Sequence, residues 1–419
     1  MNRKVLYVWS NFIIKILLFL FMMTLPVSLT LSNILLGTAV IIFFATYPFS
    51  YRFYGLPDKK NLKTLFISPF MVYLLVFISL FYTVNFTETV KFIEYRAALG
   101  FVPLMFFLGF RLSRREFETV VAGLIPGVFL IITYYFLLGI YGLNSGSIGV
   151  KDFTFSTLED YDVPFLAHRT YISFYAFFSL IIVLFIRYIR YKLWFKIIYA
   201  FFIIVALFSS ESRMMIGILT LFILAYPFFI NKRQRLFKTV AIIYSVLAVA
   251  VVVPVLLGNY DKVVSRFTEV SNEVDTDALM DEVGYDSRAA RWGVALDLIK
   301  KRPLTGYGSG AEKEILVESY DDRGLVWSGL FNLDTHNQYL SFGMENGIPA
   351  MIFYVSMLIV TFCKSLRQRN SIVMIFVLTC SIMSLLENIL NVNWMITVFA
   401  FVTSAQLFAD PLKRKKFNT

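Results

Sequence analysis

Charged residues are scarce in this chain. Asp, Glu, Lys and Arg make up 16% of its 419 residues, whereas a typical soluble domain carries about 25%. Hydrophobic residues make up 58%, aromatic residues 18%, and the mean hydropathy is +0.70. A soluble core cannot hide this much Phe, Ile and Leu. The composition therefore excludes a water-soluble protein and predicts an all-α polytopic membrane protein.

Cysteine and histidine are also scarce, with two residues of each. Cys363 and Cys380 lie in apolar stretches and form no zinc-binding pattern, so we expect buried small residues and no disulfide. The triplet Asp275-Thr276-Asp277 has the Asp-x-Asp form that many sugar-nucleotide enzymes use for a divalent ion, but it lies in a loose acidic loop without a nucleotide fold. We expect no metal and no cofactor.

Long apolar runs fill most of the chain. A transmembrane helix needs about 20 mostly apolar residues, and continuous apolar segments without alternation exclude strands. We expect the first segment to be retained, because Lys15 lies inside it and no small-residue cleavage site follows. Twelve segments qualify as spans: 10–30, 33–50, 65–84, 97–111, 117–141, 170–187, 193–210, 213–230, 239–257, 339–362, 371–390 and 394–409.

Basic residues set the expected orientation, because cytoplasmic turns are enriched in Lys and Arg. With a cytoplasmic N-terminus, every inward turn is basic, and both termini lie inside. The sequence pI of about 9.4 reports this asymmetry, so we expect no nucleic-acid partner. The basic groups on the inner side include Arg3 and Lys4, Lys59 to Lys63, Arg111 to Arg115, Arg187 to Lys196, Lys232 to Lys238, Lys364 to Arg369, and Lys413 to Lys416.

The predicted organisation has three parts. Residues 1–257 hold nine spans, 258–338 form one large periplasmic loop, and 339–419 hold three spans and a basic tail. Inside the loop, helical spacing of apolar residues predicts a helix over 286–301, which Pro303 and the glycines after it end. Twelve spans also suit a transporter or flippase built from two six-helix halves. However, the link at 187–196 is short, and no half-length repeat is visible.

Three arginines stand at the expected outer boundary, where charge calls for a functional hypothesis. Arg213 directly follows the short turn Ser209 to Ser212, and either pairs with Glu211, snorkels to the headgroups or binds a lipid phosphate. Arg288 and Arg291 are three residues apart and share a helix face. They form either a solvated face or a diphosphate clamp beside Trp292.

Both histidines lie at expected membrane edges. His336 stands beside Asp334 and Asn337 where the chain re-enters the membrane, and a histidine near neutral pH can take a proton from a sugar hydroxyl. A carboxylate beside it can orient the ring. His168, followed by Arg169, either lines the same outer cavity or anchors a helix at the interface. Asp334, Asn337, His168 and Arg169 are thus candidate substrate-binding residues.

These islands, in this order, resemble the O-antigen ligase and polymerase superfamily. The family pattern has Ser-Arg after a short outer turn, matched by Ser212-Arg213. It continues with an arginine four residues before a tryptophan, matched by Arg288 and Trp292, and with Pro-Leu-x-Gly-x-Gly, matched by Pro303 to Gly308. His-Asn, nine residues and Gly then match His336, Asn337 and Gly347. A second family glycine is Ala350 here. The resemblance covers about 200–360.

The resemblance implies a GT-C-like membrane glycosyltransferase of the bacterial inner membrane with a periplasmic active site. Its donor would be a glycan on undecaprenyl diphosphate. The acceptor would be a lipid A-core sugar in a ligase, which is our preferred interpretation, or another lipid-linked repeat unit in a polymerase. A relative that uses a protein hydroxyl stays open. The family marks Arg213, Arg288 and His336 as functional; Arg291 is added here as a second clamp residue.

Overall fold

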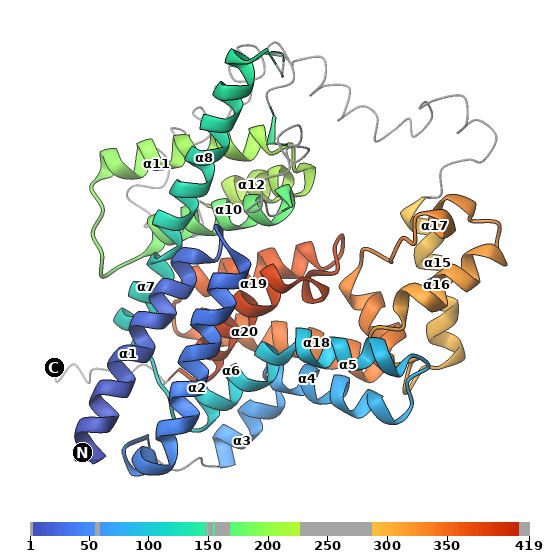
Figure 1. Cartoon of the computed structure of the whole chain (residues 1–419), viewed down its shortest axis with the longest axis horizontal. Coiled ribbons are helices and arrows are strands. Elements are labelled where there is room, and N and C mark those ends of the chain that lie inside the picture. Colours follow the sequence, from blue (N-terminus) through green and yellow to red (C-terminus); the bar gives the residue numbers. More distant parts are fainter. Residues whose placement is uncertain are drawn as a thin grey trace. The chain divides into compact units, whose positions relative to one another are not determined.

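The computed structural model describes residues 3–54, 59–146, 149, 154–155, 168–226 and 287–409. Throughout these ranges the regular elements are helices and none is a strand (Figure 1), which confirms the predicted all-α class.

The chain divides into two compact units. Unit 1 comprises Met1–Ile14, Thr38–Phe117 and Thr276–Thr419, and unit 2 comprises Lys15–Gly37 and Glu118–Asp275. The helices are α1 (Arg3–Thr24), α2 (Leu29–Tyr54), α3 (Lys59–Phe66), α4 (Pro69–Ile78), η1 (Ser79–Phe81), α5 (Phe86–Tyr95), α6 (Ala97–Phe107), α7 (Arg114–Ala122), α8 (Leu124–Asn144), α10 (Arg169–Phe185), α11 (Leu193–Ser209), α12 (Arg213–Ala225), α15 (Arg288–Lys301), α16 (Glu312–Asp321), α17 (Val326–Leu330), α18 (Gln338–Arg367), α19 (Ser371–Met383), η5 (Ile389–Asn391) and α20 (Asn393–Leu407).

Several of these helices are apolar. Among the described residues, four stretches are long and apolar enough to cross a membrane: α1, α2, Arg114–Asn144 and α18. Lys59–Phe66 and Pro69–Phe81 add a fifth if they form one span bent by 63°. The break lies near the start of the predicted span 65–84, because Ser68 caps α4 and Pro69 begins it. The other apolar helices have 10–17 residues, and predicted span 239–257 lies outside the described residues. Helix length alone therefore does not establish twelve full spans.

The two cysteines differ in exposure. Cys380 is buried in α19, as predicted, whereas Cys363 is exposed on α18. The prediction of burial was wrong for Cys363, because α18 leaves an apolar face uncovered, with Ile359 and Val360 also exposed. Both cysteines are free.

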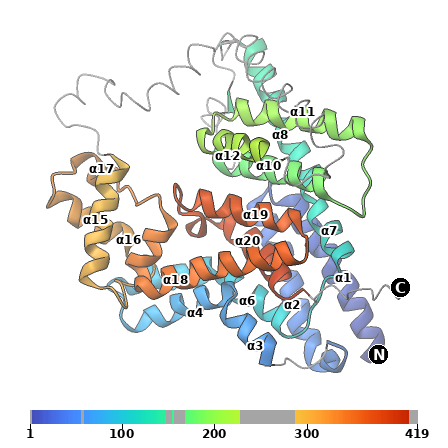
Figure 2. The ribbon, with the colours of Figure 1, turned by 180° about the vertical axis from the view of Figure 1, so that it is seen from behind.

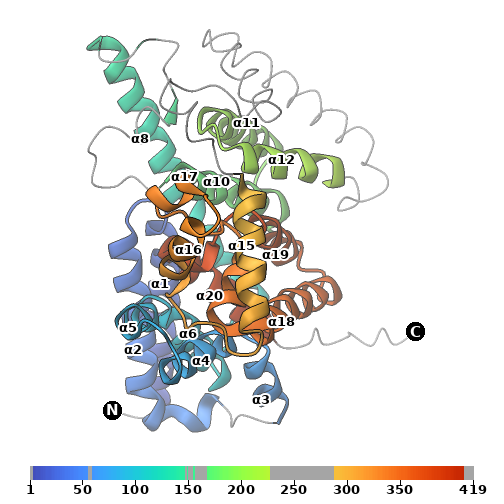
Figure 3. The same cartoon turned by 90° about the vertical axis from the view of Figure 1, so that its right-hand side faces the viewer.

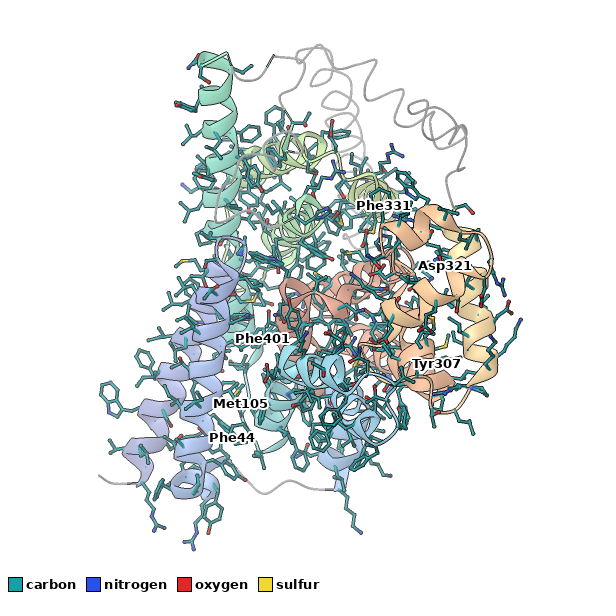
Figure 4. All side chains as sticks on the ribbon, turned by 45° about the vertical axis from the view of Figure 1, so that its right-hand side comes forward. Phe44, Met105, Tyr307, Asp321, Phe331 and Phe401 are labelled. Atoms are coloured by element: carbon teal, nitrogen blue, oxygen red, sulfur yellow. The ribbon has the colours of Figure 1, made fainter. Side chains whose placement is uncertain are left out.

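The apolar centre of unit 1 is built around α6, α18 and α20. Helix α6 packs against α4 and α20, and α18 packs against α4, α15, α19 and α20; Figure 2 shows α18, α19 and α20 side by side. Met105 of α6 is fully buried (Figure 4). The neighbouring Phe106 contacts Phe401 of α20, with 6.3 Å between ring centroids. This core fixes the start of α18, which follows directly on His336.

Helices α15, α16 and α17 form a small layer over the first half of α18 (Figure 3). Helix α15 begins after Ser287, whose hydroxyl accepts a hydrogen bond from Ala290 N–H at 3.2 Å. It ends at Lys301, before Pro303, so the helix predicted over 286–301 is confirmed. Apolar side chains hold the layer together, namely Val294, Ala295, Leu298, Ile299, Tyr307, Ala311, Leu316, Tyr320, Leu340 and Met344.

A glycine-rich turn fills a kink in α18. The helix breaks at Asn346 and Gly347, where the backbone is not helical. Tyr307 N–H donates to Met344 O and Gly308 N–H donates to Glu345 O, both at 2.8 Å, so carbonyls that the break frees are paired again. A Cβ on Gly306, at φ +67°, would lie 2.3 Å from Met344 O, which only glycine avoids. The Pro-Leu-x-Gly-x-Gly turn and the later glycine are therefore one device.

Unit 2 is centred on α10, which packs against α8, α11 and α12. Buried hydroxyls cross-link these helices: Ser173 donates to Ser210 at 2.7 Å, and Tyr199 donates to Ser179 at 2.9 Å. Such bonds satisfy polar groups that lie among apolar side chains.

Candidate functional site

The segment Asp334 to Asn337 enters α18 in a tightly fixed conformation. Asn337 caps α18, and its side-chain oxygen accepts from Tyr339 N–H at 3.1 Å and Leu340 N–H at 3.2 Å. Trp292 of α15 donates from its indole to Thr335 O at 2.9 Å. His336 itself has φ +45°, a left-handed conformation that costs a side-chain residue energy. The surroundings thus hold the histidine in a strained, defined position.

The imidazole of His336 lies between two carboxylates. Its Nδ1 is 2.7 Å from Asp334 Oδ1 and 3.9 Å from Glu387 Oε2. Asp334 Oδ1 also accepts from His336 N–H at 2.9 Å. The side chain is 33% exposed, and across the described ranges no hydrogen bond engages Nε2. A ring fixed through Nδ1 and open at Nε2 is the arrangement of a general base.

The charge of His336 also acts on Asp334. Burial by itself would raise the pKa of the Asp334 carboxyl, but the hydrogen bonds and charge of His336 outweigh that effect and hold this pKa below its ordinary value. Asp334 is therefore ionised at neutral pH.

The two arginines of α15 occupy different environments, although they share a helix face in the sequence. Arg288, the first residue of the helix, is exposed, and its guanidinium lies 3.5 Å from Leu386 O. Leu386 precedes Glu387, the carboxylate near His336, so Arg288 belongs to the same neighbourhood. Arg291 is only 3% exposed, and its Nε has no hydrogen-bond partner among the described residues. A buried N–H donor without a partner is costly unless an acceptor joins it.

The connection from α19 to α20 forms the other wall of this neighbourhood. Gln338 N–H donates to Ser384 O at 2.8 Å, and Leu390 N–H donates to Gln338 Oε1 at 2.6 Å. Tyr339 donates to Ser381 O at 3.0 Å. These bonds attach the start of α18 to the segment that carries Glu387. Unit 1 thus brings Arg288, Asp334, His336 and Glu387 to one end of α18.

Beneath the histidine lies a buried carboxyl, Glu312, in the first turn of α16. It is 4% exposed and accepts hydrogen bonds from Thr335, Ser341 and Asn388. Burial, and then the negative charges of Asp334 and Glu345, raise the pKa of Glu312 to about 7. Glu312 was not predicted from the sequence, because in the sequence it is one of many acids in an acidic loop.

A second unpredicted group is the buried ion pair of Arg96 and Glu345. Both side chains are fully buried, with Arg96 Nη1 2.9 Å from Glu345 Oε2. Arg96 also donates to Leu390 O at 3.1 Å and to Asn391 Oδ1 at 2.5 Å. The pair ties the start of α6 to α18 and to the connection before α20. In the sequence, the pair could have been suspected only from Arg96, which stands directly before the apolar run 97–111.

Replacing Arg96 by methionine should destabilise unit 1 severely, by about 3–5 kcal/mol, because Glu345 would be left buried and unpaired. Denaturant unfolding of the detergent-purified protein measures the loss. In the control variant, Arg96→Met with Glu345→Met, neither charge is buried, so less stability should be lost. Equal stability of the single variant and the wild type would contradict the importance of the pair.

The remaining predicted site residues lie in unit 2. His168 caps α10, with its Nδ1 3.4 Å from Thr170 N, and Arg169 lies 3.7 Å from Glu211. Glu211 is therefore the salt-bridge partner of Arg169. The backbone of Glu211 has φ +52°. Arg213 follows as the first residue of α12. These three candidates form a local group separate in sequence from those of α15 and α18.

Together, the apolar helices and the polar site define an all-helical, multi-pass membrane protein with a histidine–carboxylate pair at the start of one long helix. Residues 198–355 match the family model for O-antigen ligase. The match confirms the resemblance to the O-antigen ligase superfamily and supports an enzyme of the glycosyltransferase-like ligase or polymerase type. It includes Arg213, Arg288, Arg291, Asp334, His336 and Asn337. No curated protein matches the chain.

Proposed function

We propose that the chain is an O-antigen ligase-like glycosyltransferase that moves a glycan from undecaprenyl diphosphate to a sugar hydroxyl of the lipid A core. The observation that carries the proposal is the geometry of His336: Nδ1 is held by Asp334 at 2.7 Å, and the ring is one-third exposed. A glycosyl transfer to a hydroxyl needs a base placed in this way. The family match over 198–355 supports this reaction class.

The reaction proceeds as a single displacement. The acceptor hydroxyl gives its proton to His336 Nε2, and its oxygen forms a bond to the anomeric carbon of the glycan. The bond from that carbon to the diphosphate oxygen breaks, and the electron pair leaves with undecaprenyl diphosphate. Attack from the face opposite the leaving group inverts the anomeric configuration. Asp334 stabilises the imidazolium that forms, as a carboxylate does for other histidine bases.

The arginines neutralise the leaving group. Negative charge grows on the diphosphate as the glycosidic bond breaks, and fixed guanidinium groups stabilise that charge without reorganisation. Exposed Arg288 is proposed to meet the phosphate, and buried Arg291 offers an Nε–H donor that has no partner among the described residues. Arg213 is proposed as a functional residue on the family resemblance alone. Because arginines carry the charge, the reaction needs no metal. Asp275 and Asp277 lie outside the described residues.

The proposal places the enzyme in the bacterial inner membrane. Twelve spans of a GT-C-like fold would put both termini in the cytoplasm and the α15–α17 layer in the periplasm, consistent with the basic inward turns. His168, Arg169 and Asn337 are proposed as substrate-binding residues. For Asn337 this contribution is through the backbone it caps, because its side-chain oxygen is used by α18.

Analysis of lipopolysaccharide from a deletion strain tests the function. A ligase is indicated if the lipid A core loses all attached glycan while long lipid-linked polymer accumulates. A single repeat unit left on the core would instead indicate a polymerase. Unchanged lipopolysaccharide, with unchanged lipid-linked intermediates, would contradict both the ligase and the polymerase assignment. Expression of the intact chain from a plasmid is the control for restoration.

A further inference from the structure

The two carboxylate oxygens of Glu312 accept hydrogen bonds from different sets of residues. Oε1 accepts from Thr335 twice, from its N–H at 3.1 Å and its hydroxyl at 2.7 Å. Oε2 accepts from the Ser341 hydroxyl at 2.5 Å. Asn388 reaches both oxygens, at 3.2 and 3.3 Å. One oxygen therefore holds the residue before His336, and the other faces α18.

His336 needs such a support. Its left-handed backbone, at φ +45°, is retained only where neighbouring contacts determine it. Thr335 is fully buried and is held on three sides: Glu312 takes its N–H and hydroxyl, and Trp292 donates to its carbonyl at 2.9 Å. The strained residue thus follows a residue whose backbone has no freedom left.

Burial of the Glu312 carboxyl in this position also costs free energy. Nearby Arg96 is paired with Glu345, and burial raises the pKa of Glu312 to about 7. The N-terminal end of α16 and the donated hydrogen bonds offset part of this cost. An apolar residue would pack α16 against α18 at lower cost. The carboxyl therefore suits a task that packing alone does not perform.

We propose that Glu312 is the positioning residue for His336, and that it acts through Thr335. It holds the Thr335 peptide and hydroxyl so that the imidazole stays against Asp334 with Nε2 directed to the acceptor. The inference rests on the proposed function for its catalytic consequence, but the order it imposes on the imidazole is a property of the protein alone.

A pair of matched variants separates positioning from packing. Thr335→Val and Ser341→Ala each remove one buried hydroxyl that donates to Glu312, but only the first loosens the histidine segment. In the full-length purified protein, with a short glycan on undecaprenyl diphosphate as donor and lipid A core as acceptor, Thr335→Val should lower kcat at least about tenfold. The KM for the donor should change by less than about twofold. Ser341→Ala should keep kcat within about twofold of wild type at a comparable loss of unfolding temperature.

Two further variants sharpen the comparison. Thr335→Ser keeps the hydroxyl and should restore most of kcat. Glu312→Leu removes the acceptor and should lower kcat like Thr335→Val, and the double variant should lose little more, because both changes break one link. Equal kcat losses in Thr335→Val and Ser341→Ala, or independent effects of Glu312→Leu and Thr335→Val, would overturn the positioning role.

A measurement on the imidazole needs no turnover. The chain has two histidines, so NMR of protein labelled with ¹³C at histidine Cε1 should give two signals, and His336→Ala assigns them. The His336 signal should stay single in Ser341→Ala and should broaden or split in Thr335→Val and Glu312→Leu. A single unchanged signal in all variants refutes the inference. If the wild type transfers no glycan while these spectra behave as expected, the proposed function fails and the positioning stands.

Discussion

Replacing His336 by alanine should abolish glycan transfer while the protein still inserts and folds. A positioned general base contributes about 10²- to 10⁴-fold to a rate, and the arginines alone cannot take the acceptor proton. Stability should change little, because the imidazole is 33% exposed and α18 is capped by Asn337, not by His336. Transfer by purified protein from undecaprenyl diphosphate-linked glycan measures the loss.

Asp334→Asn is the graded companion of this variant. It keeps the size of the side chain but removes the charge that stabilises the imidazolium, so transfer should fall by less than in His336→Ala. Gel filtration in detergent checks that both variants remain folded. Full transfer activity in folded His336→Ala would remove the histidine from the mechanism.

Replacing Arg288 by alanine should have the second largest effect on transfer, about 10²- to 10³-fold in kcat, because a fixed charge at the leaving group is lost. Arg288→Lys should recover only part, since an ammonium lacks the planar fork that matches phosphate oxygens. Lys300→Ala is the matched control: it removes one positive charge from the exposed end of the same helix, where Lys300 pairs with Asp297 at 2.9 Å.

Single-turnover transfer separates this effect from weaker donor binding. An equal, small loss in Arg288→Ala and Lys300→Ala would mean that α15 contributes only general surface charge. If Arg288→Ala keeps the wild-type kcat, Arg288 does not stabilise the charge of the leaving group.

Local features of the structure could be predicted from the sequence. The loop helix was predicted over 286–301 and spans Arg288–Lys301, because cap, apolar spacing and proline are all local signals. The order of the motifs led to the superfamily that the match over 198–355 supports. The pairing of Asp334 with His336 could also be predicted, since only Thr335 separates them.

Contacts between distant segments were not predictable in this way. Arg96 and Glu345 are 249 positions apart, and nothing local in the sequence links the two. Glu312 is distinguished only by what surrounds it. The shared helix face of Arg288 and Arg291 did not reveal that one is exposed and the other buried, because burial depends on neighbours that spacing does not encode. Nor did the apolar run 65–84 reveal its 63° bend.

The glycine-rich turn seated in the break of α18 has a consequence for engineering. Ile348 N–H donates to Pro303 O, and Tyr307 N–H donates to Met344 O, so the α15–α17 layer and the long helix interlock through main-chain groups on both sides of Gly347. A chimera that grafts a relative's loop without its matching helix segment would leave these groups without complementary geometry. Exchange between homologues should therefore succeed when the segment from α15 to the first turns beyond the break is transplanted as one cassette.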